Sequence, residues 1–140
     1  MAKIICLWGP PCAGKSTAAK MMRQPGDVFI ERDTMHQALT GLPTHNHTKA
    51  GMAVVNAGFK AMLDRAQEVP GRFIFVTGGQ DLARRQPFID AGAEMRLIYA
   101  DRQTCLERAS TERPKDWTAY IDRWFNTYEA EAGLPHGTLL

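Results

Sequence analysis

The sequence has few cysteines and no long apolar run. Its three cysteines, Cys6, Cys12 and Cys105, lie far apart and form no C-x-x-C pair. A disulfide framework or a zinc site needs more cysteines or closer spacing, so we expect neither, and we expect a reducing compartment. No apolar segment approaches the length of a membrane span, and the one near the N-terminus is too short for a signal peptide. These absences favour a cytoplasmic protein that does not enter a membrane.

The net charge of the chain is also small. The formal net charge of 140 residues is +2, which does not by itself indicate a nucleic-acid partner. Most of the cations are arginines, which suit forked recognition of phosphate. With 44% hydrophobic and 23% charged residues, the composition is that of an ordinary globular protein. We expect one domain, residues 1–140, without an internal repeat or linker.

One motif dominates the sequence. Residues 9–17 fit G-x-x-x-x-G-K-[ST], with an apolar segment (3–8) before them and helix-forming residues (16–23) after them. Glycines let consecutive backbone N–H groups turn into one concavity, and the start of a helix adds its positive dipole end. The motif therefore predicts a nucleoside triphosphate site, with ATP bound by Gly9, Pro10, Pro11, Cys12, Ala13, Gly14, Lys15, Ser16 and Thr17.

Two side chains of this motif carry specific expectations. Lys15 is a point charge for the β- and γ-phosphates, and the Ser16 hydroxyl is a ligand for Mg²⁺. Cys12 lies inside the loop, where many residue types fit, so we do not expect a catalytic thiol. The expected cofactors are ATP and Mg²⁺.

Apolar segments alternate with helical patterns along the rest of the chain. We expect further strands at 28–30, 72–77 and 94–100, and helices at 34–39, 49–68, 82–91, 104–110 and from Trp117, with a frayed tail from Gly133. This order predicts a P-loop NTPase fold: a three-layer α/β/α domain with a parallel sheet of about four strands. The aromatic residues after Trp117 recur at helical steps, which favours core packing over base stacking.

The end of the third strand lacks a common feature of P-loop proteins. Many of them have an aspartate there, whereas this chain has Thr77. This absence counts against a motor-type ATPase, which needs that carboxylate for Mg²⁺. Arg84 and Arg85 follow on a short helix, where exposed arginines are common, although contact with an anionic substrate is the alternative.

Asp33 follows the second strand, and its role has two possible interpretations. Ligands of open α/β sheets bind outside the carboxyl ends of the strands, so Asp33 should reach the same edge as residues 9–17. It could take the proton of an attacking hydroxyl, or it could only cap the helix over 34–39. His45 and His47, with His36 nearby, allow a metal site, but a loop that contacts substrate or solvent fits the spacing better.

In three places the chain resembles the small P-loop kinases of the polynucleotide kinase type that bacteriophages encode. These places are Gly9 to Thr17, the strand end Glu31-Arg32-Asp33, and Arg108 with Arg113, which flank a short lid. The resemblance implies that Asp33 activates the acceptor hydroxyl, that Arg113 touches the transferring phosphate, and that Arg108 is a second contact to ATP. The chain departs from the family at His36, where an arginine often holds a substrate phosphate. It also resembles short phage ATP-binding proteins and kinases of hydroxymethylated bases in phage DNA.

These observations lead to three functional hypotheses. The first is an ATP- and Mg²⁺-dependent kinase that transfers the γ-phosphate to a hydroxyl of a nucleic acid or nucleotide, with Lys15, Asp33 and Arg113 as catalytic residues. The second is a kinase of a nucleoside or another small molecule. The third is an ATP-binding protein or ATPase without an acceptor hydroxyl.

Overall fold

The computed structural model describes residues 3–132, which form one sheet and its surrounding helices. The elements are β1 (Lys3–Trp8), α1 (Lys15–Met22), β2 (Val28–Glu31), α2 (Arg32–Thr40), α3 (Lys49–Ala66), β3 (Arg72–Thr77), α4 (Leu82–Asp90), β4 (Glu94–Leu97), α5 (Arg102–Glu112) and α6 (Trp117–Ala132). The predicted tail from Gly133 lies outside the described residues.

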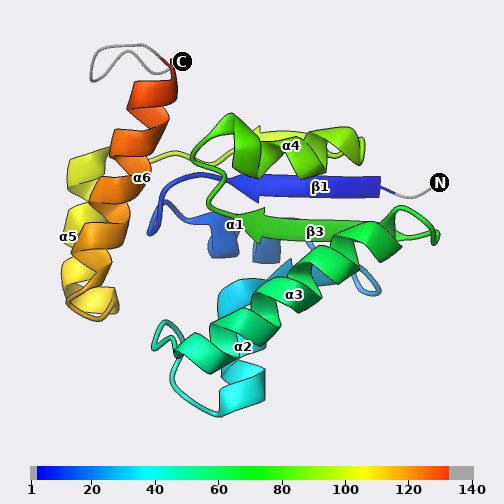
Figure 1. Cartoon of the computed structure of the whole chain (residues 1–140), viewed down its shortest axis with the longest axis horizontal. Helices are drawn as coiled ribbons and strands as arrows, with labels where there is room; N and C mark the ends of the chain where they lie inside the picture. The colour runs from blue at the N-terminus through cyan, green and yellow to red at the C-terminus, as the bar shows by residue number, and fades with distance from the viewer. Residues whose placement is uncertain (1–2, 133–140) are drawn as a thin grey trace.

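The four strands are parallel in the order β2-β3-β1-β4. β1 and β3 pair from Lys3↔Arg72 to Trp8↔Thr77, so they end level with each other. All strands point toward the same edge, where α5 and α6 also lie (Figure 1). This carboxyl edge therefore collects the segments that follow β1, β2 and β3.

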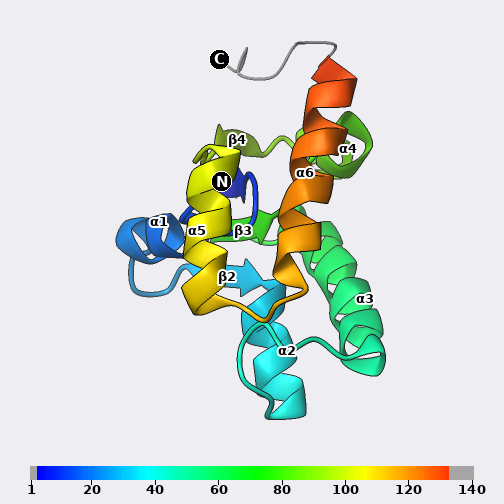
Figure 2. The same cartoon turned by 90° about the vertical axis from the view of Figure 1, so that its left-hand side faces the viewer.

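Helices cover both faces of the sheet, which confirms the predicted three-layer fold. On one face Ala19 of α1 packs in a buried cluster with residues of β1 and β3. On the other face Phe59 of α3 and Phe88 of α4 pack edge-on against Phe75 of β3. Figure 2 shows α1 on one side of the sheet, α3 and α4 on the other, and α5 and α6 side by side across its carboxyl edge. The alternation of burial along β1 and β3 is weak because strands covered on both faces are apolar throughout.

The structure corrects the predicted start of the second helix. α2 begins at Arg32, and Glu31 is its N-cap without a capping hydrogen bond from its side chain. Asp33 lies within the first turn, so the interpretation of Asp33 as the helix cap is wrong. The fourth strand is also shorter than predicted and ends at Leu97, although the Ile98 amide still donates to the Trp8 carbonyl over 2.8 Å.

The last helix packs as its pattern predicted. Ile121, Trp124 and Phe125 are buried in a cluster with Cys105 and Ala109 of α5. None of the helices in residues 3–132 has the length and apolar character needed to cross a membrane. All three cysteines are free.

Candidate active site

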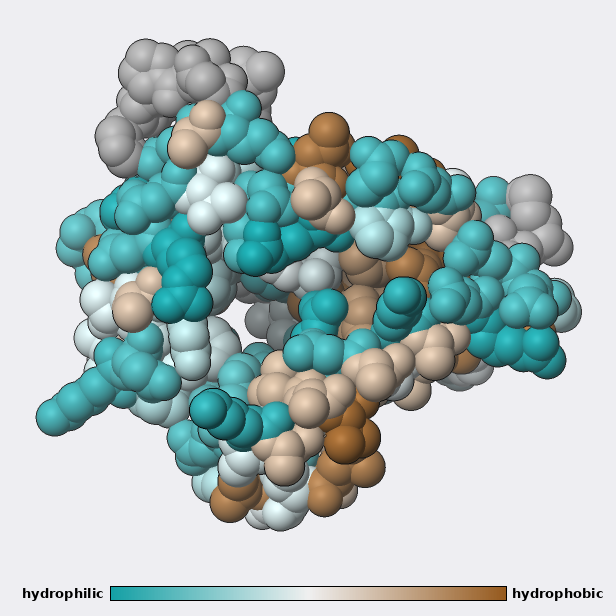
Figure 3. All heavy atoms as spheres, in the orientation of Figure 1, coloured by the Kyte–Doolittle hydropathy of each residue, from teal (hydrophilic) through white to brown (hydrophobic). Residues whose placement is uncertain are grey.

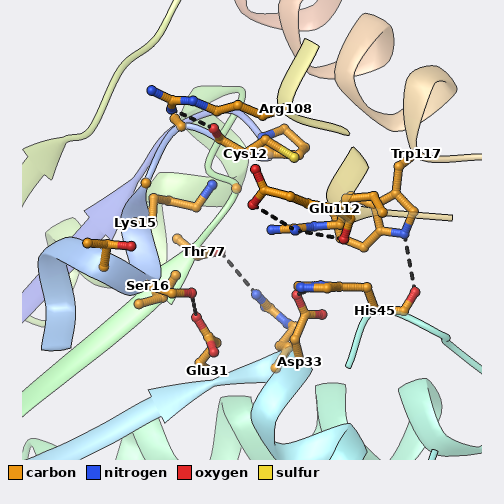
Figure 4. A pocket seen from close by; sticks show the side chains of 18 of the residues that line it. Cys12, Lys15, Ser16, Glu31, Asp33, His45, Thr77, Arg108, Glu112 and Trp117 are labelled. Carbon is orange, nitrogen blue, oxygen red and sulfur yellow. Dashed lines mark hydrogen bonds and ion pairs between the residues drawn. The ribbon is translucent and has the colours of Figure 1, made fainter. Parts of the chain in front are cut away.

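A cavity of about 640 Å³ lies at the carboxyl edge of the sheet. Its walls come mainly from five segments: residues 11–17 of the loop over 9–17, the junction of β2 and α2, the loop between α2 and α3, the end of β3, and the junction of α5 and α6. In Figure 4 Lys15 and Asp33 lie on different sides of this space, Ser16 is joined to Glu31 by a hydrogen bond, and Glu112 and Trp117 approach from the α5–α6 side. We call residues 9–17 the phosphate loop.

The phosphate loop depends on glycine at two positions. A Cβ on Gly9 would clash with the Ile98 carbonyl oxygen, and Gly14 has φ 102°, a left-handed conformation that few other residues adopt. Lys15 Nζ donates to the carbonyls of Gly9 and Pro10 over 2.6 and 2.8 Å, so its ammonium lies across the loop. Burial lowers the pKa of Lys15 to about 8. The ammonium has no carboxylate partner among residues 3–132, and an anionic ligand would supply one.

Glu31 brings a carboxylate next to Ser16. The Ser16 hydroxyl donates to Glu31 Oε2, and the Thr34 hydroxyl donates to Oε1 over 2.6 Å. Glu31 is buried and forms no ion pair within the described part of the chain. A buried carboxylate without a cation, beside a hydroxyl, is the oxygen donor set that Mg²⁺ prefers. The residues present therefore fit Mg²⁺ at Ser16 and Glu31.

Asp33 is held by two histidines of the α2–α3 loop. His45 Nδ1 lies 3.0 Å from Oδ2, and His47 Nε2 lies 2.6 Å from Oδ1. Burial alone would raise the pKa of Asp33, but the hydrogen bonds from His45 and His47 outweigh it and hold the pKa below its ordinary value. The carboxylate is therefore ionised at neutral pH, and each oxygen has a further lone pair for a ligand hydroxyl.

His36 lies edge-on to the His47 ring at 5.4 Å but forms no hydrogen bond with Asp33. It is buried, and its Nε2 accepts from the Thr48 amide over 3.0 Å, which fastens the start of α3 to α2. Among residues 3–132 no group of three or more His, Cys, Asp or Glu side chains is arranged to hold a metal ion. His45 and His47 thus serve Asp33 as hydrogen-bond partners in this structure.

Trp117, at the start of α6, closes the other side of the cavity. Its Nε1 donates to the His45 carbonyl over 3.2 Å, and its ring lies edge-on to the His45 ring at 5.1 Å. This contact joins the α5–α6 junction to the loop that holds Asp33. We call Asp33, His45, His47 and Trp117 the Asp33 cluster.

The two arginines of α5 and its end lie in different surroundings. Arg113 lines the cavity with its guanidinium 5.2 Å from the Trp117 ring centre, and its Nε is buried without a hydrogen-bond partner among the described residues. Arg108 is exposed and donates to the Cys12 carbonyl of the phosphate loop over 2.9 Å. Both therefore reach the cavity, Arg113 with an unsatisfied donor and Arg108 with a bond to the loop backbone.

Two other predicted residues contribute differently. Thr77, in place of the common aspartate, accepts from Arg32 Nη1 over 3.1 Å. Arg84 pairs with Asp81, and Arg85 pairs with Glu131 over 2.9 Å, so neither cation is free for the cavity.

Comparison with family models gives one match, to the AAA domain, over residues 4–127. The chain belongs to the AAA domain family. A search of curated proteins finds no match to this AAA domain.

Solved structures share the fold of this AAA domain at low sequence identity. One is a chain of the Pnkp1/Rnl/Hen1 RNA repair complex, with TM-score 0.71 and 14% identity over 94% of this chain. This chain covers only 45% of that one, so it spans less than half its length. The others are a gluconokinase from Sinorhizobium meliloti 1021 (TM-score 0.61, 16% identity, covering 99% of this chain and 79% of that one) and a shikimate kinase from Acinetobacter baumannii in complex with shikimate (0.59, 15%, 93% and 80%). The fold is that of P-loop kinases.

The structure brings together most residues that the motif and the strand ends predicted, namely residues 11–17 of the phosphate loop, Asp33, Arg108 and Arg113. Sequence reasoning missed Glu31 as the partner of Ser16, although its place at a strand end was a usable signal. It noticed His45 and His47 without finding Asp33 as their partner, because the path of a loop cannot be read from its residues.

Proposed function

We propose that this AAA domain is an ATP- and Mg²⁺-dependent kinase that transfers the γ-phosphate to a hydroxyl of a nucleic acid or nucleotide. One observation carries the proposal: Asp33 lines the same cavity as Lys15 and Ser16, with both carboxylate oxygens engaged by histidines. A carboxylate facing a phosphate loop is what an alcohol acceptor needs and what simple ATP binding does not.

Each side chain has a role that follows from its surroundings. Lys15 and the amides of the phosphate loop bind the triphosphate, and Ser16 and Glu31 hold Mg²⁺, which neutralises charge on the phosphate oxygens when bound. Arg113, which lines the cavity beside Trp117, contacts the transferring group, and Arg108 fixes the loop. Because the transition state of phosphoryl transfer is loose, positioning matters most.

Asp33 positions the acceptor hydroxyl and takes its proton. The hydrogen bonds from His45 and His47 leave the carboxylate with one orientation, which reduces the entropy lost when the hydroxyl binds. Its lowered pKa makes Asp33 a modest base, which suffices because little negative charge builds on the attacking oxygen in a loose transition state.

The test is transfer from γ-labelled ATP to a panel of hydroxyl acceptors by the wild type and by Asp33→Asn. We expect the variant to lose about 10²-fold or more of the transfer rate while its ATP affinity changes little. Glu68→Gln, which removes an exposed carboxylate paired with Arg65, is the matched control and should transfer normally. Equal transfer by wild type and Asp33→Asn would contradict the role of Asp33.

A kinase of a nucleoside or other small molecule is the second candidate. The contact between Trp117 and the His45 carbonyl bounds the cavity on the side opposite the phosphate loop, which favours a compact acceptor. The same panel decides between the two, because a small-molecule kinase would label free nucleosides or sugars and leave oligonucleotides unlabelled. ATP binding without label in any acceptor would favour an ATP-binding protein without an acceptor hydroxyl.

A further inference from the structure

His45 has an unusual backbone conformation in the α2–α3 loop. Its φ is 76°, in the left-handed region, and Cys12 is the only other non-glycine residue within 3–132 that has a positive φ. The Asn46 amide donates to the Pro43 carbonyl over 3.1 Å, so His45 is the third residue of a β-turn. A turn with a positive φ at this position ordinarily has glycine or asparagine there. A histidine keeps this conformation because its surroundings hold it.

Two hydrogen bonds hold His45, one through its side chain and one through its backbone. The ring Nδ1 lies 3.0 Å from Asp33 Oδ2, and the carbonyl accepts from the Trp117 indole Nε1–H over 3.2 Å. The rings of His45 and Trp117 also meet edge-on, with their centres 5.1 Å apart. Figure 4 shows the indole bond to the His45 carbonyl, with the His45 ring lying beside Asp33. The residue that contacts the carboxylate is therefore fastened to α6 by its backbone.

Trp117 is the fixed partner of this bond. It is the first residue of α6, it is 7% exposed, and its amide donates to the Pro114 carbonyl over 3.1 Å. Further along α6, Trp124 and Phe125 are buried in the core. The α2–α3 loop, by contrast, is mostly exposed. Trp117 therefore transmits the position of a helix that is packed in the core to a loop that has little packing of its own.

The bond between Trp117 and His45 connects two walls of the candidate active site. Figure 3 shows the molecule hollowed at the carboxyl edge of the sheet, between the α5–α6 pair and the rest of the chain. Both residues line this cavity, and so does Arg113, whose guanidinium lies 5.2 Å from the Trp117 ring centre. The α5–α6 junction thus carries a cation toward the cavity and also holds the loop that engages Asp33.

We propose that Trp117 is a positioning residue for the acceptor base: its indole N–H holds His45 in the left-handed turn, and this turn directs the His45 ring toward Asp33. This inference rests on the proposed kinase function and adds the residue that keeps its base oriented. Without the indole bond the turn relaxes to a negative φ, which is the lower-energy conformation for histidine. The ring then leaves Asp33, which loses one of its two histidine partners. The base is therefore fully oriented only while the α5–α6 junction is in place.

The test is a double-mutant cycle of Trp117→Phe and His45→Asn. Phenylalanine keeps an aromatic ring beside Arg113 but has no N–H. Asparagine adopts the left-handed conformation more readily than most residues, and its side-chain amide can donate to Asp33 in place of Nδ1. Transfer from γ-labelled ATP is measured with a 5′-hydroxyl oligonucleotide and with thymidine. We expect Trp117→Phe to lower kcat about tenfold with little change in the KM for ATP, but less than about threefold when His45→Asn is already present.

Trp124→Phe is the matched control. Its Nε1 donates to the Gly78 carbonyl over 2.8 Å, so the variant also removes an indole hydrogen bond from α6. Its effect on kcat should be the same with and without His45→Asn, because Trp124 does not contact His45 through this bond. If Trp117→Phe has no effect on kcat, or has an equal effect with and without His45→Asn, the proposal is overturned, since Trp117 would then contribute packing alone.

Crystal structures of the wild type and of Trp117→Phe give a readout that needs no transfer. In the variant we expect a negative φ at His45 and an Nδ1 atom beyond hydrogen-bond distance of Asp33. An unchanged His45 would overturn the positioning role of Trp117 and leave the kinase proposal standing. Absent transfer by the wild type to every acceptor would instead contradict the kinase proposal, and the structural result would still decide whether Trp117 holds His45.

A second replacement removes the N–H while keeping the size of the ring system. β-(3-Benzothienyl)alanine has a sulfur atom where indole has its N–H, so it fits where tryptophan fits. Cys105 is a free cysteine, and ligation there of a synthetic peptide for residues 105–140 introduces this amino acid at position 117 of the full chain. This protein should show the same loss of kcat and the same relaxed turn as Trp117→Phe. Wild-type behaviour in either measurement would overturn the proposal.

Discussion

The phosphate loop and the Asp33 cluster face each other across one cavity, but they are built in different ways. The phosphate loop is nine consecutive residues, and its internal hydrogen bonds from Lys15 to the Gly9 and Pro10 carbonyls span six and five positions. The Asp33 cluster joins α2, the α2–α3 loop and α6, with Trp117 bonded to a residue 72 positions away. A local site is preserved wherever its strand and helix form, whereas an assembled site depends on every element that carries a part of it.

Because of this difference, we expect a single substitution in the phosphate loop to cause a large loss of transfer rate and ATP affinity. Lys15→Met removes the charge that faces the triphosphate, and we expect transfer to fall on the order of 10³-fold, with a large loss of ATP affinity. Labelled-ATP transfer and calorimetry measure both effects. Lys20→Met, an exposed lysine of the same helix, is the control. A Lys15→Met protein that binds ATP as the wild type does would mean that Lys15 does not contribute to binding of the triphosphate.

Glu31→Gln tests the point where the two regions meet. The variant keeps the shape of the side chain but removes the charge beside Ser16. We expect an increase of roughly 10- to 100-fold in the Mg²⁺ concentration needed for half-maximal transfer, with little change at saturating Mg²⁺. Titration with Mg²⁺ at fixed ATP gives the answer, and an unchanged Mg²⁺ requirement would assign Glu31 a structural role.

The double variant His45→Ala/His47→Ala tests the assembled site through its pH dependence. The two hydrogen bonds hold the pKa of Asp33 below its ordinary value against the effect of burial. Without them the pKa of Asp33 rises, so Asp33 becomes protonated at a higher pH. As the pH is lowered, the transfer rate of the double variant should therefore fall at a higher pH than that of the wild type. We also expect about a tenfold lower rate at neutral pH, because the carboxylate loses its fixed orientation.

The conservative variant His47→Gln separates this role from simple packing. Glutamine can still donate a hydrogen bond to Asp33, so most of the rate and of the acid limb should be retained. If the double variant has the wild-type pH profile, the histidines do not act through Asp33.

The smallest expected effect concerns the charge of Lys15. Because burial lowers its pKa to about 8, a substantial fraction of the free protein is neutral at this position at pH 8.5. Bound ATP favours the ammonium, so ATP binding at pH 8.5 should take up a fraction of a proton, and binding at pH 7.0 much less. Calorimetry in two buffers with different ionisation enthalpies measures this uptake. Equal proton uptake at both pH values would contradict the lowered pKa.

The sequence predicted the local elements well and the contacts between them poorly. β1, β3 and the three-layer fold were predicted correctly, because apolar runs and the glycine motif act over short distances. The predicted start of α2 was two residues late. Asp33 was a candidate N-cap of this helix, but in the structure the N-cap is Glu31. The catalytic roles of Lys15, Asp33 and Arg113 stay predictions until transfer is measured.

What the sequence determined by itself is the phosphate loop between a buried strand and a helix. Its chemistry lies in backbone amides and adjacent side chains, whose positions follow from local conformation. Only the tertiary structure decided that His45 and His47 bind Asp33, that Glu31 faces Ser16, and that the Trp117 indole bonds to the His45 carbonyl. These facts depend on how loops and helices pack across the carboxyl edge of the sheet, and residues distant in sequence meet there only when the whole core has formed.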